Sequence, residues 1–356
     1  MNKKVDDKLT PLRVISNFND GKLTLENANE LLILIFKNSK IYNERLETIE
    51  YLGSIITKNN RNFKFLENIL ISDTDPFIRK EVASVIAENF PDQAAHSFRW
   101  ELKNEKSPIV IKSILDIIIN DKKNPLHKLQ AEANRWLSEF GNLLNITPKE
   151  AYFILDIESI FSLYDKSNTL NNDTFKFYKE LEKLNTKTKW FSIKNRHIQS
   201  LKFNIYKWTF LRNSLALMKS FNKYRDLDLL LSLLRQMDLD VKKFNRIPLS
   251  IGNLKHLEFL DLSENNLKVL PPSIQHLNPL KQLDLSYNNI TIFPHTLLSL
   301  DNLEILDLRF NNLSEVPTEI DQLINLQKLY LKGNSIRNIS NNLRKFLESL
   351  KIDIEI

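Results

Sequence analysis

The strongest constraint on the fold is a period of 23 residues that runs through the C-terminal third of this 356-residue chain. Leucines fill three columns of the repeat, and an asparagine follows them at the same offset in four successive copies. These asparagines are Asn265, Asn288, Asn311 and Asn334. A single unit of this length cannot cover its own apolar face, whereas stacked units can, so the period predicts a pile of equivalent coils.

The consensus unit is L-x-x-L-x-L-x-x-N-x-L-x-x-L-P-x-x-I-x-x-L, and it resembles the leucine-rich repeat in its short intracellular, Ras-suppressor-like type. The alternation in Leu260-Asp261-Leu262 predicts a short strand whose two leucines point inward. The asparagine can bond backbone groups of the neighbouring turn, so we expect a ladder of asparagines. Apolar spacing after the proline predicts a short helical return. The expected fold is an α/β leucine-rich-repeat solenoid with a parallel sheet and short convex helices.

Clear copies of the unit begin at residue 234, although the first of them lacks the asparagine. We also expect an atypical first repeat over residues 198–233, behind a capping strand at Trp190–Ile193. Residues 341–356 show an amphipathic helical pattern and then strand-like alternation, which is typical of a cap over the end of a solenoid. The leucine-rich repeats are therefore predicted at 191–340, followed by this C-terminal cap.

Residues 1–145 carry apolar residues at helical spacing, interrupted by turn signals. Two segments, which begin at Asp75-Pro76 and at Ser107-Pro108, open with a capping side chain and a proline at the first helical position. They resemble the second helix of the HEAT repeat, whose pattern is D-P-x-V-R-x-x-A. We therefore expect an all-α HEAT-like helical solenoid; an irregular helical bundle is the alternative. Residues 146–190 are expected to form a helical connector and capping region, with a helix that starts at Thr147-Pro148.

The concave face of the leucine-rich repeats is the candidate binding site, because its outward strand positions are not needed for packing. Apolar and aromatic side chains stand there among charges of both signs, which is typical of a protein interface. The aspartates have a second explanation, since aspartate is the usual residue at that position of the repeat. The predicted partner-binding residues are Phe259, Asp261, Glu264, Gln282, Asp284, Tyr287, Ile305, Asp307, Arg309, Phe310, Lys328, Tyr330 and Lys332.

These features predict a non-enzymatic scaffold or adaptor that binds another protein on the concave face. The strands fix the spacing of the side chains, and a partner's shape and charge are matched against that grid. The resemblance to the Ras-suppressor type implies a narrower alternative, in which the protein regulates small-GTPase signalling through the same face.

A basic segment offers a minor alternative function. Residues 176–225 hold 13 lysines and arginines against two acidic residues, interleaved with aromatic residues. Such a segment can bind nucleic acid through phosphate contacts and base stacking. In the other interpretation the aromatics form the core of the capping region and the lysines form its solvated face. Several aromatics fall in repeat columns, which favours that second interpretation.

The composition argues against most catalytic chemistry. The chain has no cysteine, which excludes disulfides, thiolate metal sites and thiol catalysis and favours a reducing, cytoplasmic location. Its six histidines show no metal-binding spacing, and its five glycines leave little material for phosphate-binding loops. We therefore expect no enzyme activity, no cofactor and no metal site. No stretch of the sequence approaches the roughly 20 apolar residues that a membrane span needs.

Overall fold

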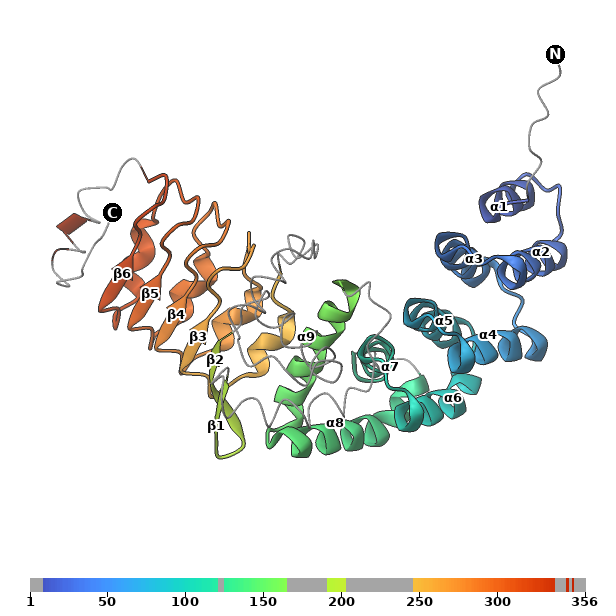
Figure 1. The fold of residues 1–356 in the computed structure, drawn as a ribbon, viewed down its shortest axis with the longest axis horizontal. Coiled ribbons are helices and arrows are strands. Elements are labelled where there is room, and N and C mark those ends of the chain that lie inside the picture. The colour runs from blue at the N-terminus through green and yellow to red at the C-terminus, as the bar shows by residue number, and fades with distance from the viewer. Residues whose placement is uncertain are drawn as a thin grey trace, which may run out of the picture. The chain divides into compact units, whose positions relative to one another are not determined.

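The computed structural model describes most of the chain, at residues 9–120, 125–164, 191–202, 246–336, 344, 345 and 348. The chain divides into two compact units, residues 1–136 and 137–356 (Figure 1). The domain limits inferred from the sequence stay a prediction. Most of three predicted segments lies outside the described residues: the atypical repeat at 198–233, the basic segment at 176–225 and the cap at 341–356.

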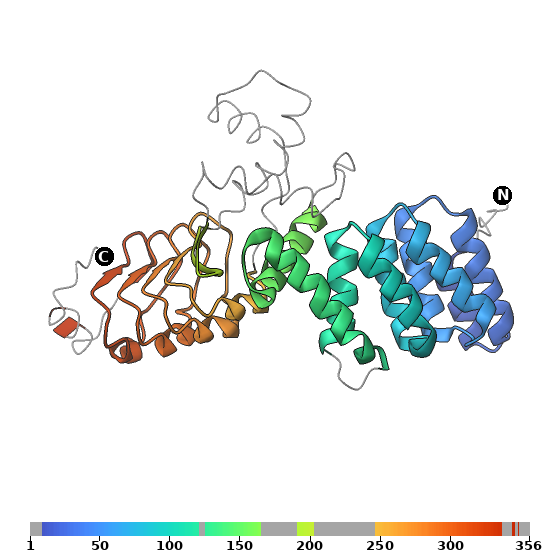
Figure 2. The ribbon, with the colours of Figure 1, turned by 90° about the horizontal axis from the view of Figure 1, so that it is seen from below.

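The N-terminal unit is built from helices joined by short connections (Figures 1 and 2). α2 packs on α3 and α4 packs on α5, while α3 packs on α5 and α5 on α7. The described helices of this unit are α1 (Pro11–Asn19), α2 (Leu25–Asn38), α3 (Tyr42–Ile55), α4 (Asn60–Ser72), α5 (Pro76–Asn89), α6 (Pro91–Asn104) and α7 (Pro108–Asn120). A 3-10 turn, η1 (Pro125–Leu129), and α8 (Gln130–Leu144) follow, and α8 runs across the division between the units.

Capping side chains and prolines set the starts of helices in this unit. Asp75 Oδ1 accepts a hydrogen bond of 2.8 Å from the backbone N–H of Phe77, ahead of Pro76 at the first position of α5. Pro108 is likewise the first residue of α7. Such caps satisfy amide groups that have no partner within the helix. The helix starts predicted at these two prolines are therefore confirmed.

Two equivalent ion pairs link consecutive helix pairs. Arg79 of α5 binds both carboxylate oxygens of Glu105, just after α6, with N···O distances of 2.9 Å. Arg45 of α3 binds Asp73 in the same way, just after α4. The side chains of Asp73 and Glu105 are only 7% and 6% exposed. Because the same contact recurs one helix pair later, the helices from α2 to α7 form repeated pairs.

Within the described residues, the C-terminal unit contains a six-stranded sheet in the order β1 to β6. β1 pairs with β2 antiparallel, and the later neighbours pair in parallel. Short 3-10 turns return the chain along the other side of the stack (Figures 1 and 2). The strands are β1 (Phe191–Lys194), β2 (His197–Lys202), β3 (Phe259–Asp261), β4 (Gln282–Asp284), β5 (Ile305–Asp307) and β6 (Lys328–Tyr330). The turns are η3 (Leu249–Asn253), η4 (Pro272–His276), η5 (His295–Ser299) and η6 (Thr318–Gln322).

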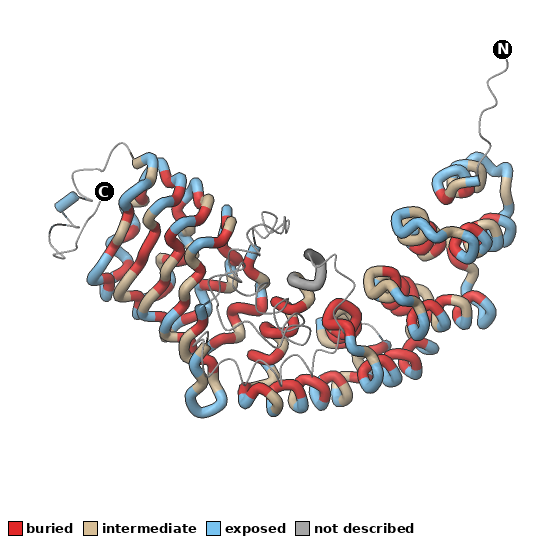
Figure 3. The backbone as a smooth tube through the Cα atoms, viewed as in Figure 1, coloured by how far each residue is buried: buried red, intermediate tan, exposed pale blue. Residues whose placement is uncertain are grey.

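The register of the sheet follows the sequence period. Leu260 pairs with Leu283, and Leu283 pairs with Leu306, so each step advances by 23 residues. These leucines and Leu329 are at most 2% exposed, and burial alternates along each coil (Figure 3). Burial of one leucine side chain contributes roughly 2 kcal/mol. The inward leucine columns predicted from the sequence therefore form the core of this unit.

The strand beside β3 is β2, rather than the strand expected from the copy that starts at residue 234. Ser200 of β2 pairs with Phe259, and Ile198 and Leu201 are buried. The described part of that copy is its second half, which contains η3. β2 can take this place because its buried apolar residues cover the edge of the core that β3 leaves open.

α9 (Pro148–Tyr164) lies at the β2 end of the repeats and packs on η3. Its start agrees with the helix start predicted at Thr147-Pro148. Glu150 is 1% exposed; one of its oxygens bonds the Thr147 hydroxyl at 3.0 Å, and the other accepts from the backbone N–H of Ile198 at 3.1 Å. A buried hydrogen bond thus joins α9 to β2. The capping strand predicted at Trp190–Ile193 overlaps β1, which folds back on β2.

Candidate functional site

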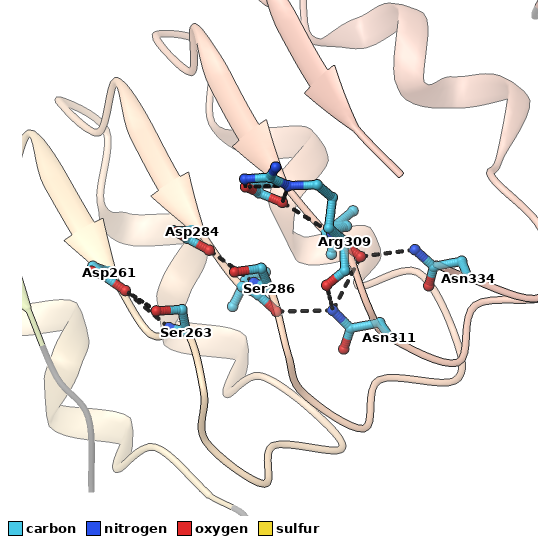
Figure 4. Close-up of polar contacts among 10 residues, drawn as sticks. Asp261, Ser263, Asp284, Ser286, Arg309, Asn311 and Asn334 are labelled. Atoms are coloured by element: carbon cyan, nitrogen blue, oxygen red, sulfur yellow. Dashed lines mark hydrogen bonds and ion pairs between the residues drawn. The ribbon is translucent and has the colours of Figure 1, made fainter. Parts of the chain in front are cut away.

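Asparagines at the turns form hydrogen bonds from coil to coil. Asn288 Nδ2 donates to the carbonyl oxygens of Leu262, in the preceding coil, and Leu285, in its own coil, both at 2.9 Å. Its Oδ1 accepts from the backbone N–H of Leu267, again in the preceding coil, at 3.0 Å. Asn265 donates to Leu262 O at 2.8 Å. The contacts of Asn288 recur one and two coils later, at Asn311 and Asn334 (Figure 4).

The side of the sheet that carries the outward side chains of β2 to β6 is called the open face below. Its aspartates bond the backbone two residues onward (Figure 4). Asp261 Oδ1 accepts from the N–H and the hydroxyl of Ser263 at 3.0 and 2.6 Å. Asp284 Oδ1 accepts from the N–H of Ser286 at 2.8 Å. These bonds fix the chain where each strand ends, so the aspartates have a structural role of their own.

Asp307 is buried, unlike Asp261 and Asp284, although the sequence predicted it to be an outward binding residue. Arg309 reaches across it, with Nη2 2.6 Å and Nε 3.0 Å from the carboxylate. The guanidinium carbon also lies 5.0 Å from the centroid of the Tyr330 ring. Asp307 is only 6% exposed. Arg309 therefore neutralises the charge of Asp307. The side chains of Arg309 and Tyr330, rather than Asp307, form the accessible surface of the open face at β5.

Asp284 of β4 also contributes a carboxyl group to the open face. Burial raises the pKa of the Asp284 carboxyl, and the nearby charges of Asp307 and Asp261 raise it further, while hydrogen bonds from Ser286 lower it. Both raising effects disfavour the ionised carboxylate.

Two aromatic side chains of the site stand at left-handed backbone positions. Tyr287 and Phe310 have φ angles of +55° and +53°, a conformation that bulky residues rarely adopt. Glu264 and Gly333 hold the same turn position in the coils on either side, with φ of +55° and +78°. The two rings stack, with centroids 4.4 Å apart and 16° between their planes. They remain 53% and 41% exposed, so burial in the core does not offset the backbone strain.

Gly333 makes room for this stack. An added Cβ would lie 2.5 Å from Phe310 Cδ1, and φ would be strained for alanine. We expect Gly333→Ala to lower the free energy of unfolding by about 2 kcal/mol, since Phe310 must turn away from Tyr287. Gly21→Ala is the matched control, with φ of +71° but nothing within 4 Å of the new Cβ, and should cost about 1 kcal/mol. Urea unfolding measures both; equal losses would show that Gly333 does not support the ring stack.

A groove of about 570 Å³ lies on the open face between β1 and β4. Its predicted lining residues are Phe259, Asp261, Gln282 and Asp284. The side that β1 and β2 contribute could not be predicted from the period, because those strands lie outside the 23-residue register. That side includes Ser192, Gln199, Ser200 and Lys202.

The other predicted residues lie further along the open face or at its edges. Glu264, Lys328 and Lys332 are exposed, and Ile305 and Tyr330 are half-buried. The predicted set is therefore not one cluster. It forms an acidic groove at β3 and β4, an aromatic pair in the turns after β4 and β5, and a basic end at β6.

The family model described as a leucine-rich repeat region matches residues 214–351. Among solved structures, a leucine-rich repeat protein of Leptospira interrogans is 28% identical over 32% of this chain and 38% of that one, with a TM-score of 0.26. The crystal structure of PEPR1–AtPEP1 is 25% identical over 42% of this chain and 17% of that one, with a TM-score of 0.28. This chain thus spans well under half the length of either. Among curated proteins, none matches it.

The chain contains a leucine-rich repeat region, as its period predicted. The family match, the parallel strands in 23-residue register and the asparagine hydrogen bonds all support this assignment.

Within the described ranges, no helix combines the length and the apolar character needed to cross a membrane. The same ranges hold no group of three histidine, aspartate or glutamate side chains placed to bind a metal ion.

Proposed function

We propose that this protein is a non-enzymatic scaffold or adaptor that binds a protein partner on the open face of its leucine-rich repeats. The observation that carries the proposal is the exposed stack of Tyr287 and Phe310. Two large rings are held in a strained backbone conformation without being buried, and such side chains supply much of the binding energy of protein interfaces. Leucine-rich repeat domains generally act as protein-interaction modules, which agrees with the proposal.

The charges of the open face describe the partner that would fit. Asp261 and Asp284 line the groove at the β3 and β4 end, whereas Lys328 and Lys332 are exposed at the β6 end. Since Asp307 is neutralised by Arg309, the face changes from acidic at β3 and β4 to basic at β6, while Lys202 of β2 adds one cation at the opposite side of the groove. A complementary partner carries a cation towards β3 and an anion towards β6, with apolar side chains between them.

The triple variant Phe259→Ala, Tyr287→Ala, Phe310→Ala is expected to lose its specific partners. Truncating a central aromatic anchor costs about 2 kcal/mol or more of binding free energy, so the loss of three should abolish capture. Affinity purification of the tagged full chain, followed by mass spectrometry, measures the effect. Retention of every partner by this variant would exclude the open face as the binding site.

The matched control is Leu249→Ala, Ile292→Ala, Ile324→Ala. These three side chains are 69%, 73% and 73% exposed, and they belong to the return segments of the coils. The control removes a similar apolar area outside the open face, and we expect it to keep the partners. If both triple variants lost the same proteins, exposed apolar surface in general would explain the capture.

A narrower form of the proposal makes the partner a small GTPase whose signalling this protein regulates. Its support is the resemblance of the repeat unit to the Ras-suppressor type. Purified small GTPases in both nucleotide states can be tested for binding and for a change in turnover. If neither effect occurred, the small-GTPase proposal would be excluded, while the proposal of a general scaffold would stand.

We also propose that the N-terminal helix pairs are HEAT-like. Arg79, which stands at the arginine of the D-P-x-V-R pattern, pairs with Glu105, and Arg45 makes the equivalent contact with Asp73. The cysteine-free sequence supports a cytoplasmic location as part of this proposal.

A further inference from the structure

The N-terminal unit carries a second surface, which the function proposed above does not use. A groove of about 770 Å³ lies between α2 and α4. It arises because α3 packs directly on α5, while the backbones of α2 and α4, the other helices of the same two pairs, lie further apart and meet through side chains such as Phe36 and Phe65. Ile33, Phe36, Phe65 and Ile69 line it with apolar surface. Phe36 and Ile69 are buried, whereas Ile33 and Phe65 are half-buried.

The charged residues that line this groove are mostly cations. They are Lys37, Lys40, Arg45, Arg61 and Lys64, against one carboxylate, Asp73, which Arg45 already binds. Arg61 contacts Glu30 at 3.3 Å, but these side chains are 82% and 64% exposed, and such exposed pairs contribute little. Lys40 and Lys64 are exposed and make no ion pair with any residue that the structure describes. The groove therefore carries positive charge that the described chain leaves uncompensated.

The aromatic rings of the groove are already engaged by its own cations. The Arg45 guanidinium carbon lies 4.5 Å from the centroid of Phe36, and the Lys37 ammonium lies 5.6 Å from that of Phe65. The two rings meet edge to face, with centroids 5.8 Å apart. Nucleic acid needs open ring faces for base stacking, and a small phosphate ion gains no favourable contact from the apolar residues that line the groove. These contacts favour a peptide that offers both carboxylates and apolar side chains.

We propose that the groove between α2 and α4 binds an acidic, partly apolar segment of another protein. The carboxylates of the segment pair with Lys40, Lys64 and the neighbouring cations, while an apolar side chain enters between Ile33 and Phe65. The opposite charges also draw the partner in, so binding weakens as salt concentration rises. This groove belongs to the N-terminal unit. The proposal can therefore be tested independently of the open face of the leucine-rich repeats.

Fluorescence anisotropy with the full chain tests this binding. The probe is a labelled peptide of alternating glutamate and leucine, and a second peptide carries glutamine in place of each glutamate. The double variant Lys40→Ala, Lys64→Ala is expected to bind the acidic peptide roughly tenfold more weakly. The double variant Lys80→Ala, Lys103→Ala, whose exposed lysines lie on α5 and α6 outside the groove, makes the same change in net charge. It should bind within roughly twofold of the unchanged chain.

Three results would overturn the proposal. The first is that the acidic peptide fails to bind, or that the glutamine peptide binds equally well. The second is that both double variants weaken binding alike, because net charge rather than the groove would then be responsible. The third is that tripolyphosphate or a single-stranded oligonucleotide displaces the peptide at equal concentration of charge, because the groove would then be a phosphate site.

Discussion

Replacing Asn288 by alanine is expected to lower the free energy of unfolding by about 3 kcal/mol, because several buried backbone groups would lose their partner. The side chain donates to the carbonyls of Leu262 and Leu285 and accepts from the N–H of Leu267. It is 5% exposed, so water cannot replace these bonds. Urea unfolding followed by circular dichroism measures the loss.

Asn302→Ala provides the control within the same repeats. Asn302 is exposed, and among the described residues it makes one hydrogen bond, to the carbonyl of Asn278 at 2.9 Å. Its replacement should cost about 0.5 kcal/mol. Similar losses for the two variants would mean that the asparagine hydrogen bonds do not hold the coils together.

Replacing Glu101 by glutamine is expected to stabilise the protein at about pH 8, on the order of 3 kcal/mol. Glu101 lies on α6 and is 1% exposed, and its Oε1 makes no hydrogen bond to any described residue. Burial and, to a lesser degree, the charge on Glu105 raise the pKa of this carboxyl from 4.5 to about 8, although Arg79 opposes the shift. Glutamine keeps the shape of the protonated acid and cannot ionise.

The pH dependence gives the direction of this effect. Because the folded-state pKa lies above that of the unfolded chain, the stability that Glu101 contributes is complete below about pH 4.5 and is lost as the pH rises to about 8. Glu101→Gln should therefore be nearly neutral at the acidic end and stabilising at the basic end. Glu88→Gln makes the same charge change on the exposed surface of α5, and should stay within about 0.5 kcal/mol. Equal destabilisation by Glu101→Gln at both pH values would show that the carboxyl is not held protonated.

The leucine-rich part of the fold could be predicted in detail because each column recurs. Leu260, Leu283 and Leu306 share one environment, and their common offset determines the register of β3, β4 and β5. The neighbour of β3 could not be predicted in this way. β2 lies outside the period, and a short strand with two buried residues carries no register information beyond its own alternation.

The sequence predicted which residue types the open face carries, but not their backbone conformation or their contacts with one another. The sequence shows that Tyr287 and Phe310 are not needed for the leucine core, but their backbone conformation depends on the turn before each asparagine. Gly333 is the one member of that turn position whose residue type suggests a positive φ. The burial of Asp307 under Arg309 also depends on which rotamer the arginine adopts. Such contacts between side chains are not encoded in a repeat pattern.

The groove on the N-terminal unit was missed for a different reason. Its cations come from α2, α3, α4 and the connection after α2, and no short stretch of sequence shows them together. The overall charge of the chain, +6, also gives no sign of where it gathers. The packing of α3 on α5, which leaves the backbones of α2 and α4 further apart, brings Lys40 and Lys64 to the same groove.

The asparagine bonds between coils have a direction. Three of the described asparagines donate to the preceding coil: Asn288 to Leu262, Asn311 to Leu285 and Asn334 to Leu308. Each new coil therefore supplies the side chain that pairs backbone groups of the coil before it, such as Leu262 O and Leu267 N–H. The repeats are suited to fold vectorially, in the order in which the ribosome releases them.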